Sequence, residues 1–378
     1  MRVLLAGGGT AGHINPALAI AGIIKEKNKN SEILFVGNLT GMESKLIPAA
    51  GYNFAGVDVR GFRRKLNAKN IIYDIGAVRR MFTSGFEAKK IIKDFKPDIA
   101  VGTGGYVSGP VLRQAAKMGI PIVIHESNAF PGMATKMLSK YASSVMIATE
   151  DAKKYLDEKC NVEITGNPVR EEILKFTKET ARRELMLDED KPMILSFGGS
   201  LGADKINKAV ADLIAYTTKE KSVYHMHATG KNGYSWMPRL VEEKGVNLSF
   251  NKQVKILEYI NNMPLCINAA DIVICRAGAM TVSELQAAGK ASILIPSPNV
   301  AENHQYYNAM SLVKKDAAVL IEDKNLTGET LIKEVENLLN NKTKIKEMGQ
   351  NAQKIAIVDA TQRIYEIIVR ILKTKNKK

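Results

Sequence analysis

Short apolar segments alternate with longer helical segments along this chain, and the alternation begins again near its middle. Runs suited to buried parallel strands occupy residues 3–6, 33–36, 99–101, 120–124 and 144–148 in the first half. The second half carries such runs at residues 193–197, 222–226, 272–275 and 292–295. Strands that alternate with helices predict a parallel sheet covered by helices, so the chain is predicted to be an α/β protein.

The length and the repeated alternation predict two domains. A chain of 378 residues is long for one hydrophobic core, and a seam is expected near "TGNPVR" at residues 165–170. We therefore expect two doubly wound Rossmann-like domains, residues 1–165 and residues 166–354. Asn15 and Pro16 form a suitable N-cap and N1 pair, which predicts a first helix over residues 16–27.

Three of the expected strands run into glycine-rich turns, at residues 7–12, 102–110 and 198–203. Glycine allows backbone N–H groups to approach a phosphate, and a helix that begins there adds the positive end of its dipole. A single turn of this kind is explained equally well by a tight strand-to-helix connection. Three of them at separate strand ends predict phosphate groups on both sides of a cleft between the two domains.

The first turn has the spacing of a dinucleotide fingerprint, Gly7-x-Gly9-x-x-Gly12. Such a site needs an acidic residue at the end of the second strand to hold the ribose hydroxyls. Here no carboxylate follows residues 33–36 until Glu43, so the fingerprint is incomplete. A nicotinamide-dependent oxidoreductase remains the alternative that the motif alone suggests.

Composition narrows the class of protein. No apolar run approaches the roughly 20 residues that a membrane-spanning helix needs. Cys160, Cys266 and Cys275 lack the spacing of a metal site or a redox pair, and the chain enters a strand without a basic leader. These features favour a cytoplasmic protein.

The net charge of +15 is concentrated in residues 60–96, which contain eleven lysines and arginines but only three acidic residues. Apolar residues recur there at spacings of three and four, which predicts an amphipathic helix flanked by cations. Nucleic acid and an anionic membrane surface are candidate partners, and a surface helix packed on its own core explains the pattern equally well. Few aromatic residues interleave with the charges, which weakens the case for single-stranded nucleic acid.

Seven motifs resemble those of a known protein family. They are "GGGTAGHINPALAIA", "VGTGGYVSGP", "HESNAFPG", "ITGNPVR", "SFGGSLGA", "CRAGAMTVSEL" and "ENHQYYNA". In order and spacing they resemble the motifs of the MurG family, bacterial glycosyltransferases of the GT-B fold that act in peptidoglycan synthesis. The resemblance spans residues 1–309. It implies two Rossmann-like domains facing a deep cleft, with a last helix, about residues 355–378, that packs back on the first domain.

The resemblance also implies an activity. It is the metal-independent, inverting transfer of N-acetylglucosamine from UDP-N-acetylglucosamine to the 4-hydroxyl of lipid I, the undecaprenyl-pyrophosphoryl-N-acetylmuramyl-pentapeptide, which gives lipid II. No cofactor and no nucleic acid is implied. Because lipid I stays in the membrane, the basic helix would hold the first domain on the anionic inner leaflet of the cell membrane.

Site residues follow from the resemblance position by position. On the acceptor side it implies a substrate-binding set of Thr10, Ala11, Gly12, Gly104, Gly105 and Tyr106, and it implies that Asn128, like Gln305, binds sugar hydroxyls. On the donor side it implies Arg170, Ser200, Ile260, Ala279, Met280, Thr281, Val282, Ser283, Glu284 and Gln305. Glu284 would accept hydrogen bonds from both ribose hydroxyls, since a carboxylate offers two acceptor oxygens.

His13 is the predicted catalytic base, because an imidazole titrates near neutral pH and this one follows the first glycine loop. Glu126 in "HESN" is the rival, and the choice between them stays open at this level. His225 and His227 share one side of a strand without a third ligand, so a structural role is expected for them, as for His125. Two further hypotheses compete with this one: a transferase for another lipid acceptor, and a membrane-binding or nucleic-acid-binding module without catalysis.

Overall fold

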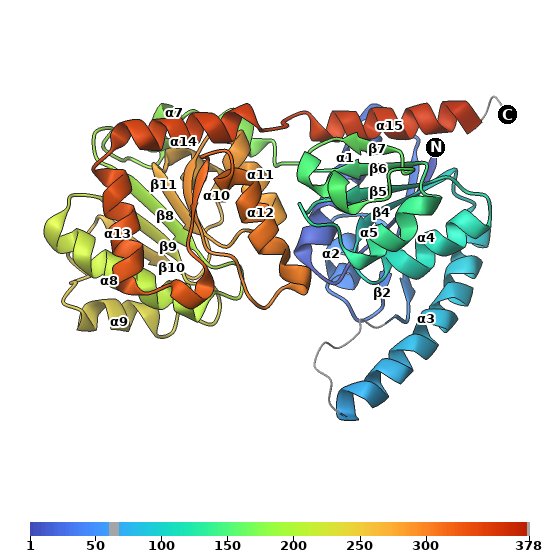
Figure 1. The fold of residues 1–378 in the computed structure, drawn as a ribbon, viewed down its shortest axis with the longest axis horizontal. Helices are drawn as coiled ribbons and strands as arrows, with labels where there is room; N and C mark the ends of the chain where they lie inside the picture. Colours follow the sequence, from blue (N-terminus) through green and yellow to red (C-terminus); the bar gives the residue numbers. More distant parts are fainter. Residues whose placement is uncertain (60–67, 376–378) are drawn as a thin grey trace. The chain divides into compact units, whose positions relative to one another are not determined.

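The chain folds into two compact units in the computed structural model (Figure 1), which describes residues 1–59 and 68–375. The side chains of residues 68–79, 81 and 82 lie outside this description. One unit comprises residues 1–168 together with 358–378, and the other comprises residues 169–357. Most of the expected basic segment therefore falls on residues whose side chains are not described.

The first unit contains a parallel sheet in the order β3-β2-β1-β4-β5-β6-β7. Its strands are β1 (Arg2–Gly7), β2 (Glu32–Asn38), β3 (Asn53–Val57), β4 (Ile99–Gly104), β5 (Ile122–Glu126), β6 (Ser144–Ile147) and β7 (Val162–Ile164). Its helices are α1 (Ala11–Lys27), α2 (Glu43–Ala49), α3 (Ala68–Phe95), α4 (Ser108–Lys117), α5 (Met133–Leu138) and α15 (Ala360–Lys375). The order reverses beside β1, so the ends of β1 and β4 meet at the place where ligands bind in such sheets.

The second unit repeats the plan with the order β10-β9-β8-β11-β12-β13. Its strands are β8 (Met193–Phe197), β9 (Tyr224–Ala228), β10 (Val254–Leu257), β11 (Ile272–Cys275), β12 (Ala291–Leu294) and β13 (Ala318–Leu320). Its helices are α6 (Glu172–Lys175), α7 (Lys178–Glu184), α8 (Asp204–Glu220), α9 (Met237–Glu243), α10 (Met263–Ala269), α11 (Ala279–Ala287), α12 (His304–Val313), α13 (Gly328–Leu339) and α14 (Lys342–Lys354). The expectation of two doubly wound α/β units is confirmed.

Both faces of each sheet are buried. In β1 the alternating residues Val3 and Leu5 join one apolar cluster, whereas Leu4 and Ala6 join another on the opposite face. Side chains of successive strand residues point to opposite faces, so a strand covered on both sides reads as a continuous apolar run. This is why the central strands were recognisable in the sequence.

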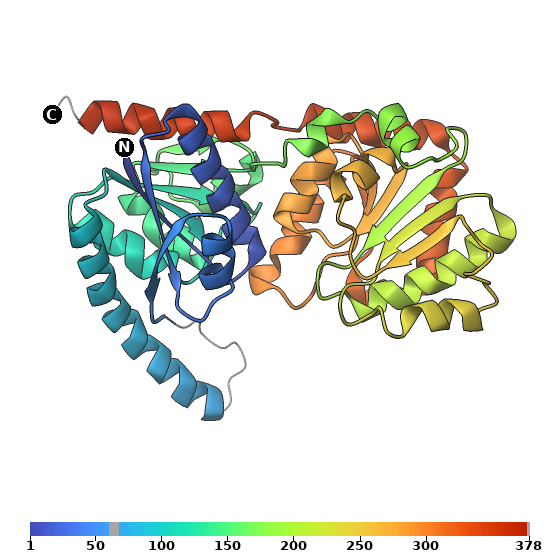
Figure 2. The same cartoon turned by 180° about the vertical axis from the view of Figure 1, so that it is seen from behind.

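The last helix completes the core of the first unit. Ile364, Ile367 and Ile368 of α15 are buried in the same cluster as Ile20 of α1. Figure 2 shows α1 in blue beside α15 in red. A chain segment from the far end of the sequence therefore supports the helix that begins at the first glycine loop.

The predicted start of the first helix is wrong. α1 begins at Ala11 after the extended residue Thr10, and Pro16 lies inside the helix. The N–H groups of His13 and Ile14 both donate to the Thr10 carbonyl, so the helical turn is already formed before the proline. His13 therefore stands in the first turn of a helix and not in a loop.

Candidate active site

The glycine-rich turns lie at the carboxyl ends of strands in each unit. The first follows β1 and the second follows β4, its neighbour in the same sheet, while the third follows β8 in the other unit. The structure thus brings the first two turns together and places the third on a separate sheet.

In the first unit, the His13 ring is held by the loop that precedes it. Its Nδ1 lies 3.0 Å from the Gly8 carbonyl oxygen and 3.2 Å from the Thr10 hydroxyl. A carbonyl oxygen only accepts hydrogen bonds, so Nδ1 carries the proton in this arrangement. When the ring is neutral, its lone pair then lies on Nε2, and a general base needs such a lone pair to accept a proton.

The second glycine turn packs against His13. The Thr103 hydroxyl donates to the His13 carbonyl at 2.7 Å. A Cβ on Gly104 would stand 3.0 Å from His13 Nε2, and one on Gly105 would stand 2.3 Å from the Gly8 carbonyl oxygen. Both glycines have positive φ, of 104° and 82°. The close approach of the two loops therefore depends on the absence of side chains at these positions.

Glu126 is a poor candidate for the base. Its Oε1 accepts from the backbone and side-chain nitrogens of Asn128, both at 3.0 Å. Its Oε2 accepts from Gly132 N at 3.0 Å and from the Thr135 hydroxyl at 2.6 Å. Taking a proton from a substrate would disrupt this set of four hydrogen bonds. The carboxylate orients Asn128 and its loop, and the geometry favours His13.

A residue that the sequence interpretation missed lies beneath the first glycine loop. Glu43 is fully buried, and its carboxylate accepts hydrogen bonds from the N–H groups of Gly9 and Asn38. Asn38 also donates from its side chain to the Tyr106 hydroxyl at 3.1 Å. The glycines at positions 37 and 41, on either side of Asn38, were the available signal for such a closely packed group.

In the second unit, a hollow of about 570 Å³ opens beside the third glycine turn. Two predicted site residues, Thr281 and Gln305, line it, whereas Ser200, Ile260 and Glu284 are not among its lining residues. The full lining is Phe197, Gly198, Gly199, Gly202, Ala203, Asp204, Lys205, Asn232, Arg276, Gly278, Thr281, Ser297, Pro298, Asn299, Gln305 and Asp323. The Gln305 side-chain oxygen accepts from Ser297 N at 2.8 Å, which orients its amide.

The helix α11 carries the remaining predicted donor residues. It begins after the extended residue Gly278, so Ala279, Met280, Thr281, Val282 and Ser283 occupy its first turns. Backbone N–H groups at a helix N-terminus favour anions, and the helix contributes the positive end of its dipole.

Glu284 follows in α11 and is paired with Arg170. Its side chain is only 10% exposed, and the Arg170 guanidinium binds it with Nε at 2.6 Å and Nη2 at 2.9 Å. The two residues predicted to serve the nucleotide therefore contact each other directly.

Charged residues that the sequence interpretation missed form the polar side of the same hollow. Arg276 donates to the Asp323 carboxylate at 2.6 Å and to the carbonyls of Ile295 and Pro296 at 3.2 Å. Lys205 donates to the Asp323 carbonyl. Because these residues lie far apart in the sequence, only the folded sheet brings them together.

His125, His225 and His227 are buried, as expected for structural residues. Ser196 Oγ lies 2.9 Å from His225 Nε2 and 2.8 Å from His227 Nδ1, in the interior of the second unit. Burial lowers the pKa of each imidazole to about 3, so both are neutral. His125 is buried as well, donates to the Gly166 carbonyl and has a pKa lowered by desolvation.

Neither a metal cluster nor a membrane-spanning helix is found in the described residues. Within residues 1–59 and 68–375, no three His, Cys, Asp or Glu side chains are grouped as a metal ion would need. No helix in the same described part of the chain is long and apolar enough to cross a membrane.

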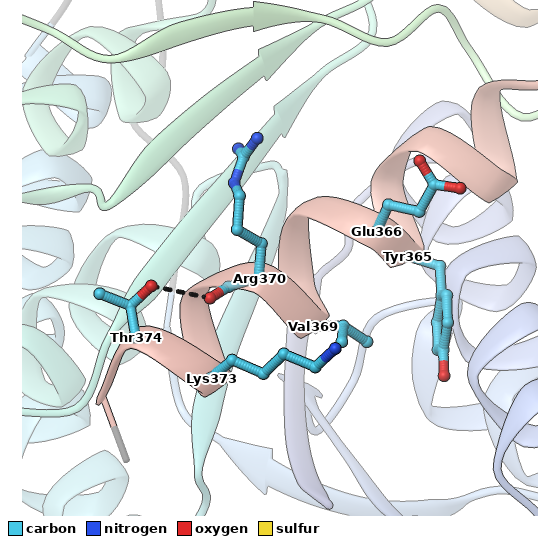
Figure 3. A pocket seen from close by; sticks show the side chains of 6 residues that line it. All are labelled: Tyr365, Glu366, Val369, Arg370, Lys373 and Thr374. Carbon is cyan, nitrogen blue, oxygen red and sulfur yellow. Dashed lines mark hydrogen bonds between the residues drawn. The ribbon is translucent and has the colours of Figure 1, made fainter. Parts of the chain in front are cut away.

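A second hollow, of about 400 Å³, runs along α15 (Figure 3). Its lining comes from that helix alone, where Arg370 pairs with Glu163 of β7 and Thr374 donates to the Arg370 carbonyl. Nothing in this hollow matches a predicted site residue.

Both units match domains of one known glycosyltransferase family. The glycosyltransferase family 28 N-terminal domain matches residues 3–147, and the glycosyltransferase family 28 C-terminal domain matches residues 193–364. The first match falls within the first unit, and the second lies mainly in the second unit.

Relatives of known name align with nearly the whole of this chain. The UDP-N-acetylglucosamine–N-acetylmuramyl-(pentapeptide) pyrophosphoryl-undecaprenol N-acetylglucosamine transferase of Acetivibrio thermocellus is 47% identical over 376 residues, 99% of each chain. The protein of the same name from Clostridioides difficile is 40% identical and covers all of this chain and 90% of its own.

Solved structures show the same likeness. The crystal structure of MurG from Acinetobacter baumannii matches with a TM-score of 0.79 and 29% identity over 98% of this chain and 99% of that one. A UDP-GlcNAc 2-epimerase from Neisseria meningitidis matches with a TM-score of 0.66 at 15% identity over 98% of this chain and 100% of that one, a likeness of fold alone.

Proposed function

The chain belongs to glycosyltransferase family 28, and on that premise we propose that it transfers N-acetylglucosamine from UDP-N-acetylglucosamine to the 4-hydroxyl of lipid I. It is a hexosyltransferase of the GT-B fold. The product would be lipid II, the precursor used in peptidoglycan synthesis. The observation that carries the proposal is the full-length identity of 47% with a transferase named for this reaction.

The acceptor is assigned to the first unit. Thr10 precedes α1, whose first residues are Ala11 and Gly12, and Gly104 ends β4 just before Gly105 and Tyr106, so the two turns lie at adjacent strand ends. Asn128 follows β5, the next strand of the same sheet. Thr10, Gly104 and Gly105 lie against the His13 ring, and the two turns offer groups that can bind a sugar hydroxyl or a phosphate oxygen.

The donor is assigned to the second unit. Glu284 would bind the ribose hydroxyls, while Ser200 and the N-terminal turns of α11 would bind the diphosphate. Gln305 would contact the sugar from the hollow, and the backbone of Ile260 would contact uracil. Arg170 holds the Glu284 carboxylate in place, which leaves the carboxylate oxygens further lone pairs for the ribose.

The reaction is a single displacement with inversion. The acceptor 4-oxygen attacks the anomeric carbon, the bond between that carbon and the UDP oxygen breaks, and the hydroxyl proton passes to His13 Nε2. The leaving UDP gains negative charge. Backbone N–H groups at the start of α11 and in the third glycine turn stabilise that charge.

Radiolabelled UDP-N-acetylglucosamine, incubated with lipid I or with diacylglycerol, tests the proposed acceptor. We expect labelled lipid II only with lipid I, and its formation should survive a metal chelator. Transfer to diacylglycerol alone, or no transfer to either lipid, would contradict the proposal.

The base is tested by His13→Ala, with Asn15→Ala on the exposed side of α1 as its control. We expect turnover to fall by two to four orders of magnitude in His13→Ala, about the usual contribution of a general base, while UDP affinity is unchanged. Retained turnover would reject His13.

Location on the inner face of the cell membrane belongs to the same proposal. Lys89 and Lys93 are exposed on the described part of α3, whereas Arg80 is paired with Asp58 and is a less suitable probe. We expect Lys89→Glu/Lys93→Glu to reduce sedimentation with anionic vesicles. Lys342→Glu/Lys346→Glu, on an exposed helix of the second unit, makes the same change in charge as a control. Equal binding by both double variants would reject α3 as the membrane contact.

A further inference from the structure

A buried carboxylate lies beneath the first glycine loop and accepts a hydrogen bond from its backbone. Glu43 Oε2 accepts from Gly9 N at 3.0 Å, and Oε1 accepts from Asn38 N at 2.9 Å. The residue is 0% exposed. A buried charge is tolerated only when it is hydrogen-bonded, so these two N–H groups are the condition for its presence. The Gly9 N–H is therefore already in use and does not face a substrate phosphate.

The chain is shaped around this carboxylate. A Cβ on Gly8 would stand 2.2 Å from Glu43 Oε1, one on Gly41 would stand 2.5 Å from Cδ, and one on Gly37 would stand 2.5 Å from Cγ. Each of these three glycines leaves the space that the side chain fills. Such close packing fixes the position of the carboxylate and not merely its charge.

The hydrogen bond to Gly9 reaches His13 through one peptide group. The Gly9 N–H and the Gly8 carbonyl belong to the same planar, trans peptide unit, so they point in opposite directions. The N–H donates to Glu43, and the carbonyl lies 3.0 Å from His13 Nδ1. A hydrogen bond at one end of a peptide strengthens the acceptor at the other end, so the carboxylate favours the tautomer with the proton on Nδ1.

A second arm ties the loops together. Asn38, whose N–H donates to Glu43, donates from its side-chain nitrogen to the Tyr106 hydroxyl at 3.1 Å and to the Val59 carbonyl at 2.7 Å. The Tyr106 ring lies 3.0 Å from where a Cβ on Gly9 would stand. Both glycine loops that contact His13 are thus connected to one carboxylate.

We propose that Glu43 is a positioning residue for the general base, acting through the Gly8–Gly9 peptide to hold His13 with its lone pair on Nε2. This inference rests on the proposed transferase function. Glu43 does not touch the substrate. Its role resembles that of the carboxylate that orients a catalytic histidine in a hydrolase triad, with a peptide unit inserted between the two side chains.

The kinetic test uses Glu43→Gln and Glu43→Asp, with Glu163→Gln as a control for loss of a hydrogen-bonded carboxylate elsewhere in the first unit. We expect Glu43→Gln to lower kcat by about 10²-fold, the order of loss that a small misplacement of a reacting group produces. The KM for UDP-N-acetylglucosamine should stay within about twofold of the parent value, since the proposed donor residues lie in the other unit. The control should keep its kcat.

Coupling to His13 separates positioning from a general structural role. If Glu43 acts through His13, the double variant His13→Ala/Glu43→Gln loses no more activity than His13→Ala alone. Losses that multiply would overturn the proposal. An unchanged kcat in Glu43→Gln would overturn it as well.

A measurement without activity separates this inference from the proposed function. The ¹⁵N resonances of the five histidines report which ring nitrogen carries the proton, and a His13→Asn sample assigns the signal of His13. We expect the Nδ1–H tautomer in the parent protein and a mixture of tautomers in Glu43→Gln. The same tautomer in both would reject the positioning role even if transfer is observed. A protein that transfers nothing, yet shows the tautomer shift, would reject only the transferase.

Glu43→Asp covers the case in which Glu43→Gln does not fold. The shorter side chain keeps the charge but retracts it by one methylene from Gly9 and Asn38. We expect an intermediate loss of kcat with an unchanged KM for the donor, and a partial shift of the His13 tautomer. Parent-like kcat and tautomer in this variant would overturn the proposal.

Discussion

Arg170 and Glu284 lie 114 positions apart in the chain and form a two-pronged ion pair in which each carboxylate oxygen accepts one guanidinium N–H. The pair joins the segment that opens the second unit to the helix α11. Since Glu284 is the proposed ribose ligand, the orientation of its carboxylate depends on a residue outside its own helix. Nucleotide affinity should therefore depend on the geometry of Arg170 and not only on its charge.

Arg170→Lys is expected to weaken UDP binding about tenfold. Lysine keeps the positive charge but cannot bind both carboxylate oxygens in the planar geometry of a guanidinium. A tenfold loss corresponds to about 1.4 kcal/mol of binding free energy. Isothermal titration with UDP measures it, and Arg239→Lys, which alters the exposed pair with Glu243, is the control. Equal affinities in the two variants would mean that only charge matters at position 170.

Gly105→Ala is expected to disable the first unit's site. The residue has φ of 82°, and a Cβ would stand 2.3 Å from the Gly8 carbonyl oxygen, the group to which His13 Nδ1 donates. Strain of this kind costs on the order of 1–3 kcal/mol, and relief of the clash would move the carbonyl. Thermal unfolding and turnover both report the effect, and we expect a lower Tm together with a large loss of kcat.

The matched substitution is Gly22→Ala in α1, where a Cβ has nothing within 4 Å. Alanine is favoured over glycine inside a helix by roughly 0.5–1 kcal/mol, so this variant should be slightly more stable and fully active. Equal Tm and kcat in Gly105→Ala and Gly22→Ala would show that activity does not depend on the close approach of the two loops.

The cysteines should differ in reactivity. Burial raises the pKa of Cys266 to about 11, and burial together with the Glu284 charge raises that of Cys275 still further above its ordinary value. The thiolate is the reactive species, so at pH 8 only about one Cys266 in a thousand is ionised. We expect iodoacetamide to label Cys160, which is partly exposed, and to spare the other two until the protein is unfolded. Peptide mass spectrometry decides this, and rapid labelling of Cys266 in the folded protein would contradict its burial.

The sequence predicted the central strands of both sheets but not their edge strands. All nine expected strands are present, whereas β3, β7, β10 and β13 were missed, and these four are the edge strands of the two sheets. An edge strand is paired on one side only and is less deeply covered, so it lacks the continuous apolar run that marks a central strand. β7, for example, has only three residues, of which Ile164 is exposed.

The candidate site was predictable to a similar, limited degree. The position of His13 followed from its motif, but the contact that sets its tautomer depends on the path of the loop at Gly8. Glu43 was rejected as a ribose ligand from its spacing, and its actual partner, Gly9, was invisible because the two residues are 34 positions apart. Pairing across such distances is fixed by strand order and register, which no local pattern specifies.

Acid should destabilise the second unit through its two neutral histidines. His225 and His227 have folded pKa values of about 3 and an unfolded value of 6.5. Between these limits the unfolded chain binds more protons than the folded one, so the free energy of unfolding falls as the pH drops from 6.5 towards 3. Above pH 6.5 the contribution is constant. Two such groups give a slope approaching about 2.7 kcal/mol per pH unit in the middle of the window.

Urea unfolding at pH 7, 5.5 and 4.5 tests this prediction, because the single tryptophan, Trp236, lies in the second unit and reports on it alone. The variant His227→Gln keeps a side-chain amide near Asn207, the partner of His227 Nε2, but removes one titrating ring. Its stability at pH 7 should fall because the hydrogen bond to Ser196 is lost. Its free energy of unfolding should nevertheless change less steeply with pH than that of the parent, because one titrating histidine is missing. Parallel curves for the two proteins would show that His227 is not held neutral by burial.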